Sequence, residues 1–333
     1  MNSPITGKPM IFTKEASELT FRKESFPYIH HNYLCKDTGE RFTTTDLDEA
    51  DIQQVYNQYR QKYNIPFPDE IKALRAKYDL SARKMAEILG FGINVYRNYE
   101  QGEVPNLSNA KLIRLAADPK KFKELVILNT SLKEKKRAQL LTKIEAQINN
   151  EIPHPLLAFE SSFLNLYESP NLNTGYKKIN LLKLEAVVKY FAKKLQPWKT
   201  QLNKLLFYSD FLMFKRSCYS ISGIAYRAIQ MGPVPQNYDV LYSYLAQKKA
   251  IEINTTIFDN NAIGEQFFAV NNLEETTELS NEELNVLQQV EEKFKNFSTK
   301  ELINYSHKEK AWLDNCEEKK LISYQYAFDI DFK

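Results

Sequence analysis

The stretch that decides the fold is LSARKMAEILGFGINVYRNYEQG, residues 80–102. Apolar residues recur at three- and four-residue spacing on both sides of a short segment that contains Gly90 and Gly92. This pattern predicts two helices joined by a tight turn. Ser81 stands where the first helix begins, and its hydroxyl can accept a hydrogen bond from a free backbone amide there. The inward stripe of the first helix consists of Met85, Ala86 and Leu89.

The second of these helices, expected at 93–101, has two different faces. Tyr96 and Tyr99 are three residues apart and are predicted to point into the core. Asparagine pairs with adenine through two hydrogen bonds, and arginine pairs with guanine or with a phosphate. The opposite face carries side chains of these two types: Asn94, Arg97 and Asn98. We therefore expect this face to enter the major groove of DNA.

The helical pattern extends on both sides of this pair. The expected helices are 69–78, 82–89, 93–101, 108–117 and 119–128. The residues that begin the helix at 82–89 suit phosphate binding because they are hydroxylic or basic: Ser81, Arg83 and Lys84. Helical spacing by itself is also typical of an ordinary bundle with a polar surface, so this alternative stays open on spacing alone.

The ordered set LS…MAEILGFG…YRNYEQG is narrower than a helical spacing. It resembles the Xre/Cro-type helix-turn-helix, and in particular the C-terminal domain of MqsA-type antitoxins. The resemblance implies that Asn94 contacts a base. The family's neighbouring arginine falls at Asn98 in this chain, and Arg97 stands one place earlier. The resemblance therefore leaves the preferred base open.

The N-terminal segment, residues 7–45, alternates apolar and polar residues and is rich in aromatic and β-branched types, which predicts strands and turns. MqsA-type antitoxins begin with a small zinc ribbon, and the matching stretches here are SPITGKP and YLCKDTGE. Three of the four ligand positions carry hydroxyls, and one cysteine remains: Ser3, Thr6, Thr38 and Cys35. A structural zinc site needs about four nitrogen or sulfur ligands. We therefore expect a ribbon-like sheet without metal.

Two histidines precede the remaining cysteine, Cys35. Adjacent strand residues point to opposite faces, so at most one of His30 and His31 could join Cys35 in a metal site. The simpler interpretation is that both are ordinary strand residues.

Composition limits the remaining possibilities. The chain has 333 residues, enough for two or three domains, and its net charge of +3 restricts any DNA-binding surface to a local patch. The N-terminus lacks the apolar core of a signal peptide, and we expect no membrane span. Three widely separated cysteines predict no disulfide framework, which favours a reducing cytoplasm.

The C-terminal part, from about Tyr176, carries a second set of ordered motifs. These are QLNKLLFYSDF (201–211), GIAYRA (223–228), GPVPQNYDVL (232–241) and YSHKEKAW (305–312). The first has a wide apolar face at helical spacing. A β-hairpin is predicted at 250–270.

This order resembles the Panacea domain, also called SocA-like or DUF4065. The resemblance carries over the following motif residues: Leu205, Leu206, Tyr208, Gly223, Tyr226, Gly232, Pro233, Val234, Pro235, His307 and Trp312. His307 is interpreted as a hydrogen-bonded helix residue rather than a catalyst.

Catalytic motifs are missing from the sequence, which has no Gly-rich phosphate loop, no HExxH and no Cys-x-x-Cys. On a continuous helix, His307, Asp314 and Cys316 would be too far apart to form a catalytic pair. We therefore expect no enzyme activity and no cofactor.

Together these features predict a mainly α protein with a small N-terminal β-ribbon, an Xre/Cro-type helix-turn-helix, and an α-helical Panacea domain with a minor β-hairpin. The expected order is ribbon, helix-turn-helix, helical spacer with linker, and Panacea domain, over residues 1–50, 51–130, 131–175 and 176–333.

The two resemblances imply an antitoxin. It would bind a cognate protein toxin through the Panacea domain. It would also repress its operon as a homodimer on double-stranded operator DNA. A stand-alone transcriptional regulator and a protease adaptor, with a protease as a further partner, remain the alternatives.

Overall fold

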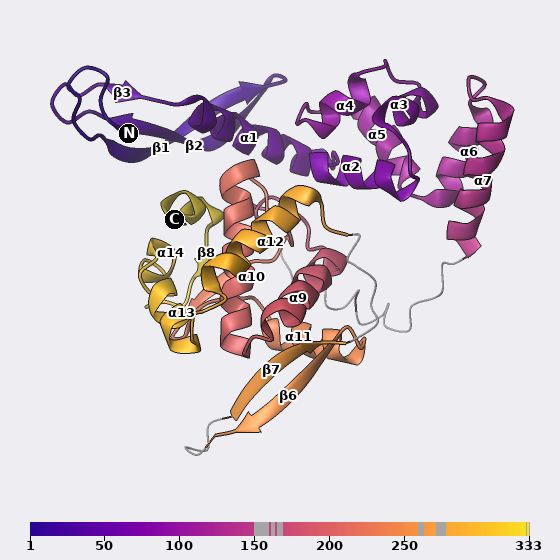
Figure 1. Cartoon of the computed structure of the whole chain (residues 1–333). Helices are drawn as coiled ribbons and strands as arrows, with labels where there is room; N and C mark the ends of the chain where they lie inside the picture. The colour runs from indigo at the N-terminus through magenta and orange to yellow at the C-terminus, as the bar shows by residue number, and fades with distance from the viewer. Residues whose placement is uncertain are drawn as a thin grey trace. The chain divides into compact units, whose positions relative to one another are not determined.

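The computed structural model describes residues 1–149, 160, 164, 169–258, 263–270, 278–330 and 332 (Figure 1). The chain forms two compact units. Unit 1 combines residues 1–58 with 163–333, and unit 2 comprises Tyr59–Ser162. The protein is mainly α, as predicted. Most of the linker expected before residue 175 lies outside the described residues.

The N-terminal ribbon of unit 1 is a long antiparallel hairpin. Strand β1 (Ile11–Phe21) pairs with β2 (Glu24–Leu34) along its whole length, and β3 (Arg41–Phe42) adds a short third strand beside the end of β2. Helix α1 (Thr45–Lys62) follows, and acidic residues in its first turn suit the positive end of the helix dipole. The predicted β-ribbon is therefore present.

Helix α1 covers the part of β2 that has no partner strand. The backbone amide of Ile29 donates to Gln54 Oε1 at 3.1 Å, and that of His31 donates to Asp51 Oδ2 at 3.1 Å. Gln54 also donates to the carbonyl of Ile29 at 2.9 Å. Unpaired strand edges need such partners when they are buried, so two side chains of α1 replace a neighbouring strand.

Unit 2 contains six helices among its described residues. They are α2 (Pro68–Lys77), α3 (Ala82–Leu89), α4 (Val95–Glu100), α5 (Leu107–Ala116), α6 (Pro119–Leu128) and α7 (Glu134–Asn149). The first five correspond to the five predicted helices. Helix α7 falls in the predicted spacer, yet Leu140 and Ile144 belong to the same hydrophobic core as α2 to α6. Its apolar stripe therefore has a partner within this unit.

The helical body of unit 1 is built around α10 (Lys199–Ser217). Helices α9 (Leu181–Leu195), α12 (Asn281–Phe294) and α13 (Thr299–Ser306) pack against it. The sequence predicted one apolar face for α10, but every residue from Leu202 to Phe214 is buried, including four polar ones. The helix is central, so its polar side chains must be satisfied inside the protein.

Small strands and short helices complete this body. Strands β4 (Tyr226–Ile229), β5 (Gly232–Pro235) and β8 (Leu321–Ile322) form a three-stranded sheet in the order β5-β4-β8. Helix α11 (Tyr238–Gln247) leads to the hairpin of β6 (Ile251–Ile257) and β7 (Ile263–Ala269), where one was predicted. Helix α14 (Lys310–Leu313) and the 3₁₀ helix η2 (Tyr324–Asp329) lie near the C-terminus.

The ribbon belongs to the same compact unit as this helical body. Lys14 of β1 forms an ion pair with Asp329 at 2.5 Å, and the ring of His31 packs on Phe328 with a centroid distance of 4.1 Å. Asn57 of α1 donates to the carbonyl of Cys218 at 2.8 Å. The sequence suggested a ribbon apart from the C-terminal domain, and the four segment limits stay predictions.

Candidate functional site

The first candidate surface is the α3–turn–α4 region of unit 2. The Ser81 hydroxyl accepts a hydrogen bond from the Lys84 amide at 3.2 Å, as the sequence predicted for the start of α3. Gly90 ends α3 with a φ of 72°, a left-handed conformation that glycine adopts without strain. The turn after it has little room, because a Cβ on Gly92 would lie 3.2 Å from Val95 Cγ2.

Two buried tyrosines fix the orientation of α4. Tyr96 is fully buried and donates from its hydroxyl to the carbonyl of Ile71 at 2.8 Å, while burial raises its pKa. Tyr99 is 3% exposed and accepts from Asn109 Nδ2 at 2.8 Å. Because both rings point inward, the opposite face of the helix turns outward. Arg97 and Asn98 lie on this face and are exposed, as predicted, and Asn94 is exposed too. The predicted helix 93–101 is shorter in the structure, so Asn94 directly precedes α4 and is not part of it.

The predicted phosphate-binding residues lie at the start of α3. Ser81 and Arg83 are exposed. Lys84 is half-buried and forms an ion pair with Glu87 at 2.6 Å, so part of its charge is compensated within the helix. Arg83 is therefore more accessible to a phosphate than Lys84.

The second candidate surface is the turn between β4 and β5. The backbone pairs Ile229 with Gly232 across this turn. Trp312 donates from Nε1 to the carbonyl of Ile229 at 2.8 Å. The ring of His307 stacks on Trp312 with a centroid distance of 3.8 Å and an angle of 10°. The GPVP and YSHKEKAW motifs, far apart in sequence, therefore meet here.

A lysine that the sequence analysis overlooked lies beneath this turn. Gly232 has a φ of 96°, and a Cβ on it would lie 2.6 Å from Lys204 Cε and 2.6 Å from Ser306 Oγ. Lys204 is fully buried, and burial lowers its pKa to about 7. Glycine is thus required at 232 for two reasons, the backbone conformation and the close approach of Lys204.

A buried carboxylate, also overlooked, organises the segment before β4. Asp210 accepts hydrogen bonds from the backbone amides of Ile221 (2.8 Å) and Ser222 (2.9 Å) and from the Tyr226 hydroxyl (2.8 Å). Burial raises its pKa, and these hydrogen bonds oppose the shift. Gly223 is packed here because a Cβ would lie 2.3 Å from the carbonyl oxygen of Lys178.

Most of the predicted motif residues in this body are structural. The buried ones are Leu205, Leu206, Tyr208, Gly223, Tyr226, Gly232, Pro233, Val234 and Pro235. His307 and Trp312 are partly exposed. The segment 307–316 is not the continuous helix assumed from the sequence, because α13 ends at Ser306 and α14 has only four residues. His307 therefore lies at a helix end and turns toward Trp312.

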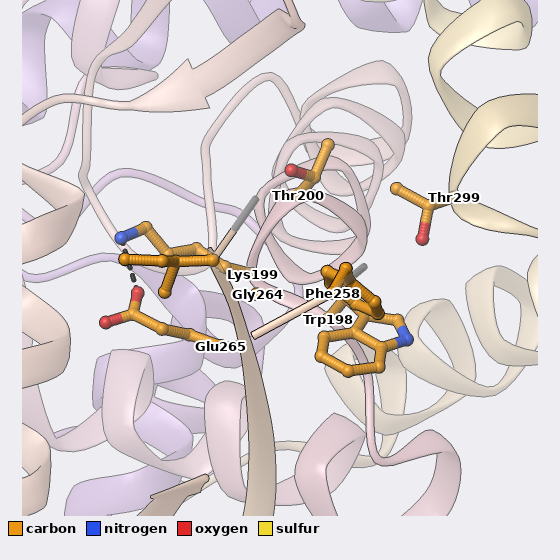
Figure 2. A pocket seen from close by; sticks show the side chains of 8 residues that line it. Trp198, Lys199, Thr200, Phe258, Gly264, Glu265 and Thr299 are labelled. Atoms are coloured by element: carbon orange, nitrogen blue, oxygen red, sulfur yellow. Dashed lines mark hydrogen bonds and ion pairs between the residues drawn. The ribbon is translucent and has the colours of Figure 1, made fainter. Parts of the chain in front are cut away.

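A pocket of about 510 Å³ lies elsewhere in unit 1, between the start of α10 and the β6–β7 hairpin. Figure 2 shows its lining, with Trp198 and Phe258 on one side and the ion pair of Lys199 with Glu265 on the other. The ion pair has an N–O distance of 2.5 Å. The motif residues do not line this pocket.

The former ligand positions of the ribbon do come together. Thr6 Oγ1 lies 3.8 Å from Cys35 Sγ, and hydrogen bonds from Ser3 and Thr38 lower the pKa of this thiol to about 6. Within the described ranges, no group of three or more His, Cys, Asp or Glu side chains is placed to hold a metal ion. Hydroxyls are poor zinc ligands, so the cluster is a hydrogen-bonded one.

The two histidines beside it contact an aspartate. His30 Nδ1 lies 2.7 Å from Asp51 Oδ2, and His31 Nδ1 lies 2.6 Å from Asp51 Oδ1. The interpretation as two ordinary strand residues on opposite faces missed this shared partner. Both rings reach it because the carboxylate lies at the open edge of β2, where it also accepts from the His31 amide.

Two known protein families match separate parts of this chain. A model of the MqsA antitoxin, the antitoxin component of a bacterial toxin–antitoxin system, matches residues 1–126. A model of the Antitoxin SocA-like, Panacea domain matches residues 202–313. The chain therefore has one region that is similar to the MqsA antitoxin and another that is similar to the SocA-like Panacea domain. No curated protein and no solved structure matches it.

Each of the two matched regions contains one of the two candidate surfaces. The MqsA-type region includes α3 and α4, and the Panacea domain includes α10, the β4–β5 turn and His307. Both models describe antitoxins, so the families support an antitoxin role with a toxin as partner. They also suggest a regulatory protein rather than an enzyme. Across the described residues, no helix is long and apolar enough to cross a bilayer.

Proposed function

We propose that this chain neutralises a cognate toxin by binding it through the Panacea domain, and that it represses its own operon through the α3–turn–α4 region. The observation that carries the proposal is the presence of an exposed Asn/Arg face in one compact unit and of the Panacea domain in the other. Occlusion by a well-packed interface is sufficient for neutralisation and requires no chemistry.

The DNA-binding part rests on the geometry of α4. Arg97 and Asn98 lie on the face opposite two buried tyrosines, and Asn94 is exposed directly before the helix, so these three side chains can reach base edges without disturbing the core. Arg83 at the start of α3 would position the protein on a phosphate. Proteins of this type bind two half-sites about one helical turn apart, so the operator complex would contain a homodimer.

The test separates the two activities within the full chain. Asn94→Ala combined with Arg97→Ala removes the groups proposed to contact bases, while the buried Tyr96 and Tyr99 stay in place. We expect the double variant to lose specific binding of its promoter DNA in gel-shift assays, by about 2–6 kcal/mol in total. The double variant should still restore growth to cells that express the cognate toxin.

Lys120→Ala provides the control, because this exposed lysine of α6 also carries one positive charge. It should weaken binding equally on specific and unrelated DNA, or not at all. Promoter binding that survives the double variant at moderate salt would refute the assignment of α4. Rescue that disappears together with promoter binding would favour the stand-alone regulator.

A further inference from the structure

Two side-chain nitrogens of the Panacea domain are shielded from solvent and have no hydrogen-bond partner among the described residues. They are Lys204 Nζ on α10 and His307 Nε2 at the end of α13. Lys204 and the residue before His307 both lie against Gly232, because a Cβ there would lie 3.0 Å from Lys204 Nζ and 2.6 Å from Ser306 Oγ. Burial and the charge of Lys204 lower the pKa of His307, and a hydrogen bond to the Gln230 backbone opposes this shift. Neither nitrogen is used in the proposed binding of toxin or DNA.

Among the residues that the structure describes, no acid compensates the burial of Lys204. A buried ammonium group without an acceptor loses its hydration and gains nothing in return. Burial is the cause that lowers the pKa of Lys204, and no carboxylate of a described residue opposes it. Glu309, two residues after His307, is 9% exposed and accepts from the Tyr208 hydroxyl at 3.2 Å.

The surroundings of Lys204 limit the size of any ligand. Gly232 packs closely on the end of this side chain, because a Cβ on Gly232 would lie 3.0 Å from Lys204 Nζ. Ser306 donates its hydroxyl hydrogen to the carbonyl of Ile303 at 2.9 Å, so it has no second hydrogen to offer. This close packing favours a small anion over a phosphate ester or a nucleotide.

We propose that Lys204 and His307 form a binding site for a small carboxylate beneath the β4–β5 turn. Lys204 would donate to one carboxylate oxygen, and a protonated His307 would donate from Nε2 to the other. Access would come from the side of the turn, where Met231 is 47% exposed. The carboxylate could be a free anion or an Asp or Glu side chain of a bound protein, because the recognising chemistry is the same.

The affinity of this site for a carboxylate should depend on pH. A carboxylate that binds the charged amine raises the pKa of Lys204. The affinity should therefore fall by about tenfold for each pH unit above the pKa of the free amine, which is near 7. Below that pH the affinity should level off, and protonation of His307 at still lower pH should strengthen binding.

The first experiment uses the full chain labelled with ¹³C and ¹⁵N at lysine, and sodium formate as the probe. Lys204→Met identifies the Lys204 signals in NMR spectra. We expect saturable shifts of these signals and a rise of at least about one unit in the pKa of Lys204 at saturating formate. Lys194→Met, which removes an exposed lysine of α9, should leave the titration unchanged.

A second variant tests the role of the imidazole. His307→Phe retains a ring against Trp312 but removes both nitrogens, so we expect weaker formate binding with an intact fold. If His307→Phe binds formate as tightly as the wild-type protein, then His307 does not belong to the site and the proposal is overturned.

A second arm distinguishes the source of the carboxylate. It repeats the Lys204 titration in the complex with the toxin, and it therefore rests on the proposed function. A raised pKa in the complex alone assigns the carboxylate to the toxin, whereas a raised pKa with formate alone assigns it to a free anion. An unchanged titration in both arms overturns the site. Toxin neutralisation with a Lys204 titration unchanged in both arms would overturn this proposal and leave the proposed function standing.

Discussion

Lys204 and Asp210 are both buried residues of α10, but their hydrogen bonding differs. Asp210 accepts from two backbone amides and from the Tyr226 hydroxyl, so its burial is compensated by hydrogen bonds. Lys204 has no such partner among the described residues, and its charge is disfavoured. A buried group without a partner lowers stability, so residues of this kind are usually retained for a role other than folding.

The stability cost of Lys204 predicts a pH dependence. Between pH 10.5 and about 7 the unfolded chain binds a proton at this lysine that the folded chain does not, so wild-type stability should rise with pH over that window. Lys204→Met has nearly the same shape and no charge. We expect it to be more stable than wild type at pH 7, by about 1–4 kcal/mol.

Urea unfolding at pH 7 and pH 9.5 measures this difference. The gap between Lys204→Met and wild type should shrink at the higher pH, because the wild-type amine is then neutral in the folded state. A variant that is less stable than wild type at both pH values would contradict the prediction and indicate that Lys204 has a partner.

At the scale of elements, short helices in this protein depend on their ends. Helix α3 has eight residues, begins with the Ser81 cap and ends at Gly90 in a left-handed conformation. Short helices are marginal by themselves, so caps and packing decide whether they form. The orientation of α4 depends on that turn, because α4 itself has only six residues.

Gly90→Ala should therefore destabilise unit 2 by about 1 kcal/mol, through backbone strain. A Cβ at this position meets nothing within 4 Å, so steric overlap adds no cost. Gly90→Asn is the matched control and should lose less, because asparagine tolerates the left-handed conformation better. Chemical denaturation followed by circular dichroism measures both. Equal losses for the two variants would show that backbone conformation is not the cause.

At the scale of the whole molecule, the ribbon is part of the unit that holds the Panacea domain. Contacts of β1 and β2 with Asp329 and Phe328, and of α1 with Cys218, connect segments from opposite ends of the sequence. These contacts and the aromatic pairs of the ribbon, such as Phe12 with His31, hold the ribbon in place.

Deletion of residues 1–44 should accordingly destabilise the helical body of unit 1. Phe328 would lose its ring partner, and Asp51 and Gln54 would lose the edge of β2. We expect the unfolding temperature of that unit to fall by about 5 °C or more in calorimetry. Lys14→Ala, which removes the ion pair with Asp329 and a hydrogen bond to the carbonyl of Gln325, should cost about 1 kcal/mol. A truncated chain that unfolds like the full one would show that the ribbon is an independent domain.

Sequence alone was sufficient for the helices of unit 2 and for the inward or outward direction of the side chains around the α3–α4 turn. The helix limits of unit 2, the Ser81 cap, the Gly90 turn and the buried Tyr96 and Tyr99 all follow from spacing and backbone chemistry within one or two turns. Such features depend on near neighbours in the chain, which the sequence displays directly.

The tertiary structure alone decided which distant residues meet. It placed α7 in the core of unit 2, joined the ribbon to the C-terminal helices, and set both His30 and His31 against Asp51. It also buried Lys204 beneath Gly232 and stacked His307 on Trp312. Burial and pairing of this kind depend on contacts across a hundred or more residues in several cases, and periodicity carries no information about such contacts.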